Sequence, residues 1–280
     1  INRGKESISL DISKPEGAEI IKRLVKDADI VVENFKVGTL DKMGLGYEEL
    51  KKVNPEIIFA SISGYGQNGP WSSLAAYDNV IQAMCGMMEM TGFPDDVPTK
   101  VGPAIGDNFT GLTMALAITM AYYHKLQTGK GQQLDVAMMD CLFGIMESPI
   151  MYKELLNEEI SRCGNTDPTL FPYDVYPCKD GYFSVGVAAG SKSEWERFCN
   201  AIAMPELLQE EKYSTNESRV ALYDELTQKI LPFFASKTKA ELNDIFLACN
   251  LPCSPVNTIP ELMEHPQLKA RNMLIPLKDD

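Results

Sequence analysis

The first sixty residues alternate between two hydrophobic periods. Short apolar runs at 7–10, 29–32 and 57–62 have the length and composition of strands, whereas the segments between them place apolar residues at helical spacing. The first helical segment opens at Pro15, a residue favoured in the first turn of a helix, and runs to Lys26. Strands separated by single helices are typical of βαβ units, so this half predicts an α/β fold with a parallel sheet.

The middle of the chain is mostly helical. Apolar residues at helical spacing predict helices at 77–88, 108–125 and 138–155, and a short apolar run predicts a strand at 134–137. Gly129 follows the second helix and is suited to the left-handed position that ends many helices.

The pattern changes after residue 160. Two predicted strands, 173–176 and 182–187, flank the dipeptide Asp180-Gly181, which is a strong hairpin signal. The remaining predicted elements are helices at 194–202, 218–234, 239–248 and 259–265 and an extended segment at 252–256. This change predicts a second domain that begins between residues 160 and 170.

The charge balance limits the classes of ligand. Of 280 residues, 26 are basic and 39 acidic, which gives a formal net charge of −13. Proteins that bind nucleic acids or anionic membranes need a net positive face, so we expect neither kind of partner. The longest apolar stretch, 112–123, is also shorter than the ~20 residues that span a bilayer. An anionic ligand would have to be held by a local group of residues.

Cysteine and histidine usage limits the chemistry. Seven cysteines occur without a C-x-x-C pair, which favours free thiols and a cytoplasmic protein. The two histidines, His124 and His265, complete neither a metal-ligand spacing nor a Ser-His-Asp triad, so we expect no metal. Because the chain begins at Ile1 rather than Met, the lack of a targeting signal carries little weight.

Two glycine-rich segments have partial phosphate-binding patterns. The segment 64–69 reads G-x-G-x-x-G after a predicted strand, which is the spacing of dinucleotide-binding loops. Helical spacing resumes only near Tyr77, so the helix that would present its amides to a pyrophosphate is displaced. The segment 128–132 lacks P-loop spacing. We interpret the first as a loop with another role and the second as a helix end.

Asp107 lies between Gly106 and the helix expected at 108–125. One interpretation is an N-cap, in which the carboxylate accepts backbone amides and stabilises the helix by ~0.5–2 kcal/mol. The other is chemical: a helix N-terminus favours the ionised form, and Gly106 leaves the carboxylate open on one side. An exposed, ionised aspartate can attack an activated carbonyl carbon. The residues alone leave both interpretations open.

Several short motifs occur in order over nearly the whole chain. They are Asn2-Arg3-Gly4-Lys5 followed by Leu10-Asp11, Val32-Glu33-Asn34-Phe35, Met43-Gly44-Leu45-Gly46, Ser63-Gly64-Tyr65-Gly66, Tyr77-Asp78, Gly106-Asp107, the segment 128–132 and the segment 178–182. Each motif is weak alone, but the ordered set resembles the class III CoA-transferase family, which includes formyl-CoA, carnitine and bile-acid CoA-transferases.

The resemblance implies an architecture. It implies a large domain with a Rossmann-like parallel sheet at 1–163, a small α+β domain at 164–266, and the start of a return to the large domain at 267–280. It also implies a homodimer of two interlocked subunits. By this comparison the chain lacks the family's first strand–helix unit and its closing C-terminal segment.

The resemblance also implies a reaction between CoA thioesters and small carboxylates. The family's nucleophilic aspartate falls on Asp107, which would attack an acyl-CoA to give a mixed anhydride and CoA thiolate. The thiolate would return to form an aspartyl-CoA thioester, which an incoming carboxylate reopens. Each addition develops an oxyanion that backbone N–H groups can stabilise. The candidates for this role, or for a mobile loop, are Gly64, Gly66, Gly106 and Gly190.

The family's CoA-contacting positions fall on segments within the first eighty residues. Lys36 and Lys42 would offset phosphate charge and Phe35 would stack on adenine, although both lysines also suit a solvated helix face. The full set is Leu10, Asp11, Ile12, Ser13, Asn34, Phe35, Lys36, Lys42, Ala75, Ala76, Tyr77 and Asp78.

The chain departs from the family pattern in two places. Gly190 ends the segment 187–190, where formyl-CoA transferases carry a run of glycines, and this speaks against formyl or oxalyl substrates. A lysine that some members place near Ala75 is absent. The donor and acceptor acids stay open, and Met84, Met87, Met88 and Met90 suit either helix packing or a substrate wall.

Two alternatives remain. The related α-methylacyl-CoA racemases place a histidine where this chain has Tyr77. Two-base racemisation needs an acid–base pair, and a phenol is poorly suited because it holds its proton at neutral pH. A non-catalytic CoA-binding protein, with Asp107 as a plain helix cap, is the second alternative. We therefore predict a CoA-transferase.

Overall fold

The computed structural model describes residues 4–146, 148–188 and 192–276, which fall into two compact units. The first unit is Ile1–Arg162 and the second is Cys163–Asp280. The assignment of 1–163, 164–266 and 267–280 to family domains stays a prediction.

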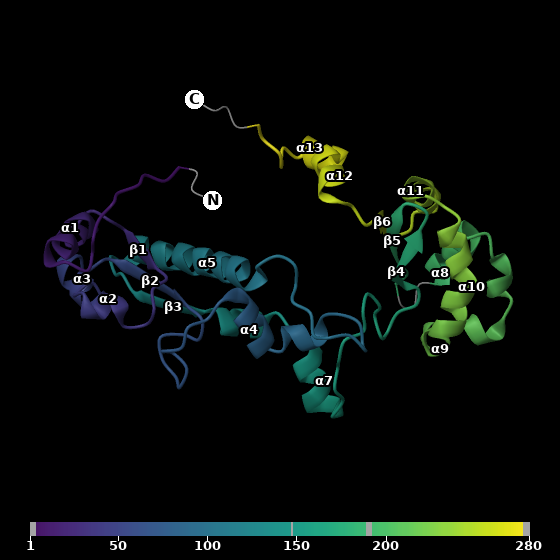
Figure 1. Cartoon of the computed structure of the whole chain (residues 1–280), viewed down its shortest axis with the longest axis horizontal. Helices are drawn as coiled ribbons and strands as arrows, with labels where there is room; N and C mark the ends of the chain where they lie inside the picture. Colours follow the sequence, from purple (N-terminus) through teal and green to yellow (C-terminus); the bar gives the residue numbers. More distant parts are fainter. Residues whose placement is uncertain (1–3, 147, 189–191, 277–280) are drawn as a thin grey trace. The chain divides into compact units, whose positions relative to one another are not determined.

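The first unit contains a parallel sheet, as predicted. Its strand order is β1-β2-β3, with Ile30 beside Ile58 and Phe59 beside Gln133. Its elements are α1 (Pro15–Val25), β1 (Ile30–Glu33), α2 (Thr39–Lys42), α3 (Tyr47–Val53), β2 (Ile58–Ser63), α4 (Asp78–Met84), the 3-10 helix η1 (Met87–Met90), α5 (Ile105–Thr128), β3 (Gln133–Ala137), α6 (Met138–Gly144) and α7 (Ser148–Leu156) (Figure 1).

The central strand β2 organises the core of this unit. Because alternate residues of a strand face opposite sides, Phe59 packs with Ala18 and Leu50 of α1 and α3, while α5 packs against β2 and β3. A second apolar cluster joins α4 to α6 through Ile81 and Leu142. The long helix α5 therefore packs against both the sheet and the α4–α6 pair.

The C-terminal end of α5 is fixed by two contacts. Gly129 takes the predicted left-handed conformation, with φ of 69°, and its N–H donates to the Lys125 carbonyl at 2.8 Å. The ammonium of Lys125, which is largely buried, pairs with Asp29 at 2.9 Å just before β1. These contacts tie the end of α5 to the edge of the sheet.

Several predicted elements of this unit differ from the structure. The helix predicted at 77–88 ends at Met84, and the 3-10 helix η1 follows it. Residues 7–10 form no strand, because no strand among the described residues lies beside them to share ladder hydrogen bonds, and Ile8 is exposed. The helix predicted at 138–155 is two helices, α6 and α7. Pro149 lies in the first turn of α7, where its missing N–H is tolerated, whereas within a continuous helix it would remove a hydrogen bond.

The second unit is an α+β arrangement around a three-stranded antiparallel sheet of order β4-β5-β6. The predicted hairpin forms, but its two turn residues are Lys179 and Asp180, and Gly181, with a φ of 147°, is the first residue of β5 and pairs with Cys178. The elements are β4 (Tyr173–Cys178), β5 (Gly181–Gly186), α8 (Lys192–Ala201), the 3-10 helices η2 (Pro205–Leu208) and η3 (Glu211–Tyr213), α9 (Asn216–Ala221), α10 (Tyr223–Ala235), α11 (Lys239–Ala248), β6 (Cys253–Pro255), α12 (Ile259–Glu264) and α13 (Pro266–Ala270).

Stacked aromatic rings hold the core of the second unit. Tyr176 of β4 stacks on Phe234 of α10 with ring centroids 4.4 Å apart, and Phe234 stacks on Phe246 of α11 at 5.7 Å. The helix predicted at 218–234 is interrupted at Leu222, which separates α9 from α10. Within the described part of the chain, no helix combines the length and apolar character that a membrane crossing requires.

Candidate active site

A large cleft of the first unit, with a volume of about 920 Å³, lies at the carboxyl ends of β1 and β2. In α/β sheets with parallel strands, ligands bind in the crevice outside these strand ends. Eight of the predicted site residues line it together: Asn34, Phe35, Lys36, Gly64, Ala75, Ala76, Tyr77 and Asp107. Residues from four separate segments thus meet in one cleft.

Other predicted residues lie outside the cleft lining. The segment 10–13 precedes α1, Lys42 is the last residue of α2, and neither is a lining residue. Asp78, Gly66 and Gly106 are not lining residues either. Asp78 and Gly106 each adjoin a lining residue in the chain, and the Gly66 N–H binds the lining residue Ser63. Gly190 lies outside the described residues. Roles for all of these stay predictions.

Side chain–backbone hydrogen bonds hold the loop after β1. The Glu33 carboxylate, which is largely buried, accepts the Phe35 N–H at 2.8 Å, and the Asn34 amide donates to the Ile62 carbonyl at 2.9 Å. The Phe35 side chain is left 47% exposed at the cleft. Its ring can offer a face to an adenine or to an apolar part of a ligand.

The glycine-rich loop 64–69 enters the cleft wall at Gly64. The Ser63 hydroxyl accepts the Gly66 N–H at 2.9 Å, and a side chain at Gly64 would place its Cβ 2.3 Å from the Cβ of Ala76. The segment that carries Tyr77 can therefore lie directly on Gly64. The next helix begins only at Asp78, so the loop lacks the following helix that a dinucleotide site requires, as predicted.

Asp107 lies in the first turn of α5, at its third residue, and not before the helix as we predicted. The helix begins at Ile105, because an orphan amide of its first turn is satisfied from elsewhere: the Gly106 N–H donates to Asp78 Oδ1 at 2.7 Å. Asp107 is exposed, and its carboxylate has no hydrogen-bond or ion-pair partner among the described residues. The N-cap interpretation of Asp107 is therefore wrong.

The pKa of the Asp107 carboxyl is raised above its ordinary value. The main cause is partial burial in the cleft wall, and the nearby Asp78 carboxylate adds to it. The N-terminus of α5 acts in the opposite direction, since it favours negative charge. A carboxylate with a raised pKa is a better base and nucleophile once it is ionised.

The raised pKa of Asp107 predicts that the stability of the fold depends on pH. The folded state holds the Asp107 proton more tightly, so the group's contribution is fully present below the ordinary pKa of 3.8 and is lost as the pH rises through the folded-state value. Asp107→Asn should therefore unfold at a higher temperature than the unmodified chain at pH ~7, and at about the same temperature near pH 3. Thermal unfolding measures this, and an equal gain at both pH values would contradict it.

The glycines predicted to stabilise an oxyanion differ in the hydrogen bonds that their backbone N–H groups make. The N–H groups of Gly66 and Gly106 are engaged by Ser63 and Asp78, so either would have to leave its partner to meet an oxyanion. Gly64 lines the cleft itself. Of the candidates that the structure describes, Gly64 is therefore the best placed.

Sequence reasoning missed two buried polar residues near Asp107. Thr110 lines the cleft one turn further along α5, and its buried hydroxyl has no hydrogen-bond partner among the described residues. Its spacing of three from Asp107 on a helix was the available signal. Gln82 of α4 is 0% exposed and binds Asp78. No pattern in the sequence distinguishes this buried glutamine from one on the surface.

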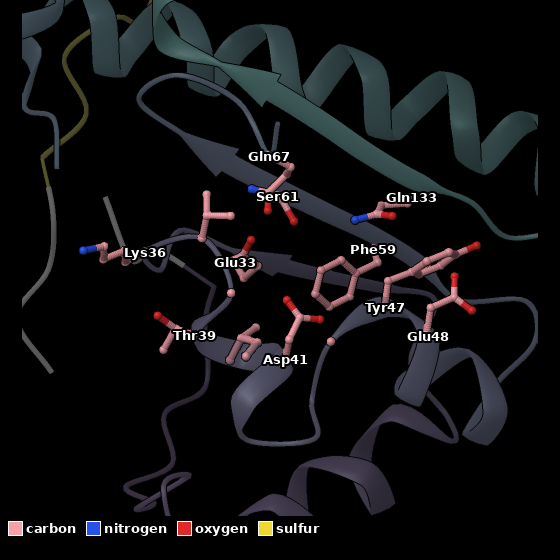
Figure 2. Close-up of a pocket in the computed structure, with 14 residues that line it drawn as sticks. Glu33, Lys36, Thr39, Asp41, Tyr47, Glu48, Phe59, Ser61, Gln67 and Gln133 are labelled. Carbon is pink, nitrogen blue, oxygen red and sulfur yellow. The ribbon is translucent and has the colours of Figure 1, made fainter. Parts of the chain in front are cut away.

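A second, smaller pocket of about 110 Å³ lies beside β1 and β2 (Figure 2). Three carboxylates line it, from Glu33, Asp41 and Glu48, and the Lys36 ammonium points away from them. Its size and charge do not suit the phosphates of CoA. Across the described ranges, no cluster of three His, Cys, Asp or Glu side chains could hold a metal ion.

The fold and the cleft define a class: an α/β protein with an exposed carboxylate, that of Asp107, in a cleft at the carboxyl edge of a parallel sheet. The model of CoA-transferase family III matches residues 1–280, and the chain belongs to this family. The predicted resemblance is thereby confirmed, and the chain is an enzyme of the CoA-transferase class.

Named relatives and a solved structure agree with this assignment. The chain is 38% identical to the succinate–glutarate CoA-transferase of Agrobacterium fabrum, over 99% of this chain and 69% of that protein. It is 36% identical to the acetyl-CoA:oxalate CoA-transferase of Acetobacter aceti, over 98% and 70%. A CAIB/BAIF family protein from Brucella suis, 39% identical, superposes with a TM-score of 0.89 over 98% of this chain and 72% of that one.

Proposed function

We propose that this chain moves CoA between carboxylic acids and that Asp107 is the covalent nucleophile. The observation that carries the proposal is the unpartnered, exposed carboxylate of Asp107 in the same cleft as Phe35, Lys36 and Tyr77. A carboxylate held by internal hydrogen bonds would first have to break them before attacking a thioester. Asp107 has no such bonds to break among the described residues.

The proposed reaction has four steps. Asp107 attacks the thioester carbonyl carbon and the C–S bond breaks, giving a mixed anhydride and CoA thiolate. The thiolate attacks the aspartyl carbonyl, the anhydride C–O bond breaks, and the donor acid leaves as a carboxylate. The acceptor carboxylate attacks the resulting aspartyl-CoA thioester and again releases thiolate. That thiolate attacks the acceptor's acyl carbon, which yields the new acyl-CoA and frees Asp107.

Holding the reactants together in the cleft makes this series of reaction steps efficient. A thiolate or carboxylate held beside the anhydride reacts at a large effective concentration, so the activated acyl group does not have to meet water. Because the steps use only carboxylate, thioester and thiolate groups, we invoke no metal. We place the enzyme in the cytoplasm, since all seven cysteines are free thiols.

For CoA, we propose that Phe35 and Tyr77 provide apolar contacts and that Lys36 and Lys42 meet phosphates. Phe35 and Tyr77 are 47% and 76% exposed, and both line the cleft. Lys36 also lines it, whereas Lys42 and the segment 10–13 would act from outside the described cleft. The remaining proposed contacts are Asn34, Ala75 and Ala76, which line the cleft, whereas Asp78 does not.

The racemase alternative has weaker support. Neither His124 nor His265 is among the residues that line the described cleft. Tyr77, which lines it, stands where the resemblance places the histidine of the racemases. The relatives reported above are named for transfer to or from succinate, glutarate and oxalate. We therefore propose a dicarboxylate as one substrate of this enzyme.

The direct test traps the intermediate. Incubation with succinyl-CoA and hydroxylamine should convert Asp107 to its hydroxamate, because hydroxylamine attacks an aspartyl anhydride or thioester at the activated carbonyl. Peptide mass spectrometry locates the modification. A sample without succinyl-CoA serves as the control and should stay unlabelled. Labelling of another residue in place of Asp107 would reject the assignment.

We also propose that the enzyme is a homodimer, and the exposed face of α5 supports this. Leu112, Leu116, Met120 and Tyr123 follow helical spacing on one face and are each between 62% and 67% exposed. Apolar side chains in such a row indicate a surface that is covered by a partner.

Leu116→Glu is therefore expected to shift the chain from dimer to monomer, because it places a charge in the proposed interface. Light scattering coupled to gel filtration measures the mass. Leu24→Glu is the matched control, since Leu24 is an exposed leucine of α1 outside this face. A Leu116→Glu chain that stays dimeric would contradict the assignment of this face.

A further inference from the structure

Asp78, the first residue of α4, binds the first turn of α5. Its Oδ1 accepts the Gly106 N–H at 2.7 Å, directly before Asp107. Its Oδ2 accepts the Gln82 Nε2–H at 2.8 Å from the next turn of α4. Both oxygens of this carboxylate are therefore held by other groups of the chain.

Gln82 extends the connection to the segment that leads into α5. Its side chain is 0% exposed, and its Oε1 accepts the Val101 N–H at 2.9 Å. Burial of an amide is costly unless its donors and acceptors are paired, so this pairing is strongly specified. One buried glutamine thus joins α4 to the chain on the N-terminal side of Asp107.

The spacing around Gly106 shows how close this contact is. A Cβ at Gly106 would lie 2.9 Å from Asp78 Oδ1, nearer than such atoms normally approach. With a side chain at position 106, either the Asp78 carboxylate or the α5 backbone would have to shift. Neither Asp78 nor Gln82 lines the cleft, so neither is placed to touch a ligand there.

We propose that Asp78 and Gln82 are positioning residues that fix the first turn of α5 and so aim the Asp107 carboxylate at the bound thioester. The inference rests on the proposed role of Asp107 and gives Asp78 a role other than CoA contact. Asp78 and Gln82 hold the segment that carries Asp107 through the Gly106 and Val101 amides, and the charge of Asp78 also contributes to the raised pKa of Asp107.

The hydrogen-bond pattern allows an exchange of the two side chains. In Asp78→Asn, the NH₂ group of the new asparagine faces the NH₂ group of Gln82, so two donors meet without an acceptor. Rotating the Gln82 amide by 180° removes that clash but places its NH₂ group against the Val101 N–H, again two donors. In Gln82→Glu, two carboxylates face each other. In the double variant Asp78→Asn/Gln82→Glu, the new asparagine accepts the Gly106 N–H and donates to the new glutamate, which also accepts the Val101 N–H. Every hydrogen bond is restored at unchanged net charge.

Kinetics at alkaline pH, where Asp107 is ionised in all variants, give the first readout. Each single variant should lower kcat by about 100-fold with KM for succinyl-CoA unchanged, and the double variant should recover to within about fivefold of the unmodified chain. If Asp78 instead contacted CoA, KM would rise in both variants that carry the Asp78→Asn change and the double variant would not recover. That result would overturn the proposal.

Amide hydrogen exchange without substrate gives the second readout. Exchange at Gly106 and Val101 should speed up at least tenfold in each single variant and return to the original rate in the double variant. Unchanged exchange at both amides in the single variants would overturn the proposal. Because this arm needs no turnover, it judges the positioning role even if Asp107→Ala were to keep full activity and so reject the proposed function.

Discussion

Asp107→Ala should lower CoA transfer by at least ~10³-fold while leaving the fold intact. The substitution removes the one enzyme side chain that forms covalent bonds in the proposed mechanism, and losses of this size are typical for a missing nucleophile. The fold should persist because the carboxylate makes no hydrogen bond or ion pair with the described residues, and its helix is held by Asp78 and Lys125 instead. Exchange of labelled CoA between succinate and glutarate measures the rate, and circular dichroism checks the fold.

The matched control is Asp140→Ala. Asp140 is also an aspartate at the third residue of a helix, α6, in the same unit, but it does not line the cleft. Its replacement should leave transfer within about twofold of the unmodified chain, as for surface substitutions in general. Near-normal turnover of Asp107→Ala would refute the covalent role, whatever the control shows.

Gly106→Ala should reduce kcat by about 100-fold. The new Cβ would lie 2.9 Å from Asp78 Oδ1 and 3.4 Å from Leu142 Cδ1, so either the Asp78 carboxylate must turn away from the Gly106 amide or the first turn of α5 must move. Either change alters the contact that holds this turn. A displacement of about 1 Å at a reacting group is enough for a loss of this size. Steady-state rates with succinyl-CoA and glutarate measure it.

Gly111→Ala is the control for this second prediction. Gly111 lies in the same helix, and a Cβ there meets nothing within 4 Å. An alanine at this position should stabilise the chain by roughly 0.5–1 kcal/mol, because it lowers the flexibility of the unfolded state, and should leave turnover unchanged. Equal activity of the two alanine variants would show that the close approach at Gly106 does not position Asp107.

The sequence predicted those parts of the fold that depend on local patterns. The strands of the parallel sheet, the left-handed Gly129 and the β4–β5 hairpin follow from apolar runs and turn signals that adjacent residues determine. The segment 7–10 has the same local pattern as a strand, but a strand also needs a neighbour, which no local pattern supplies.

The candidate site was less accessible to such reasoning. Asp107 could be singled out from its setting, but its cleft combines segments that lie far apart in the chain, and only the family resemblance linked them. The start of α5 was misplaced because Asp78, 28 residues earlier, satisfies the Gly106 amide. Gln82 went unnoticed because a polar residue in a short helix predicts a solvent-facing position, whereas this one lies in the interior.

Hydrogen bonds within the protein join the walls of the cleft, and they form without a ligand. Asn34 ties the loop after β1 to the end of β2, and Ser63 holds the amide of Gly66 in the loop that follows β2. A substrate entering such a preorganised cavity does not have to freeze these loops, and the entropy lost on binding is correspondingly small. Affinity for different acyl-CoA esters should then track the contacts of the acyl chain itself, so a narrow range of acids can be distinguished without a large rearrangement of the enzyme.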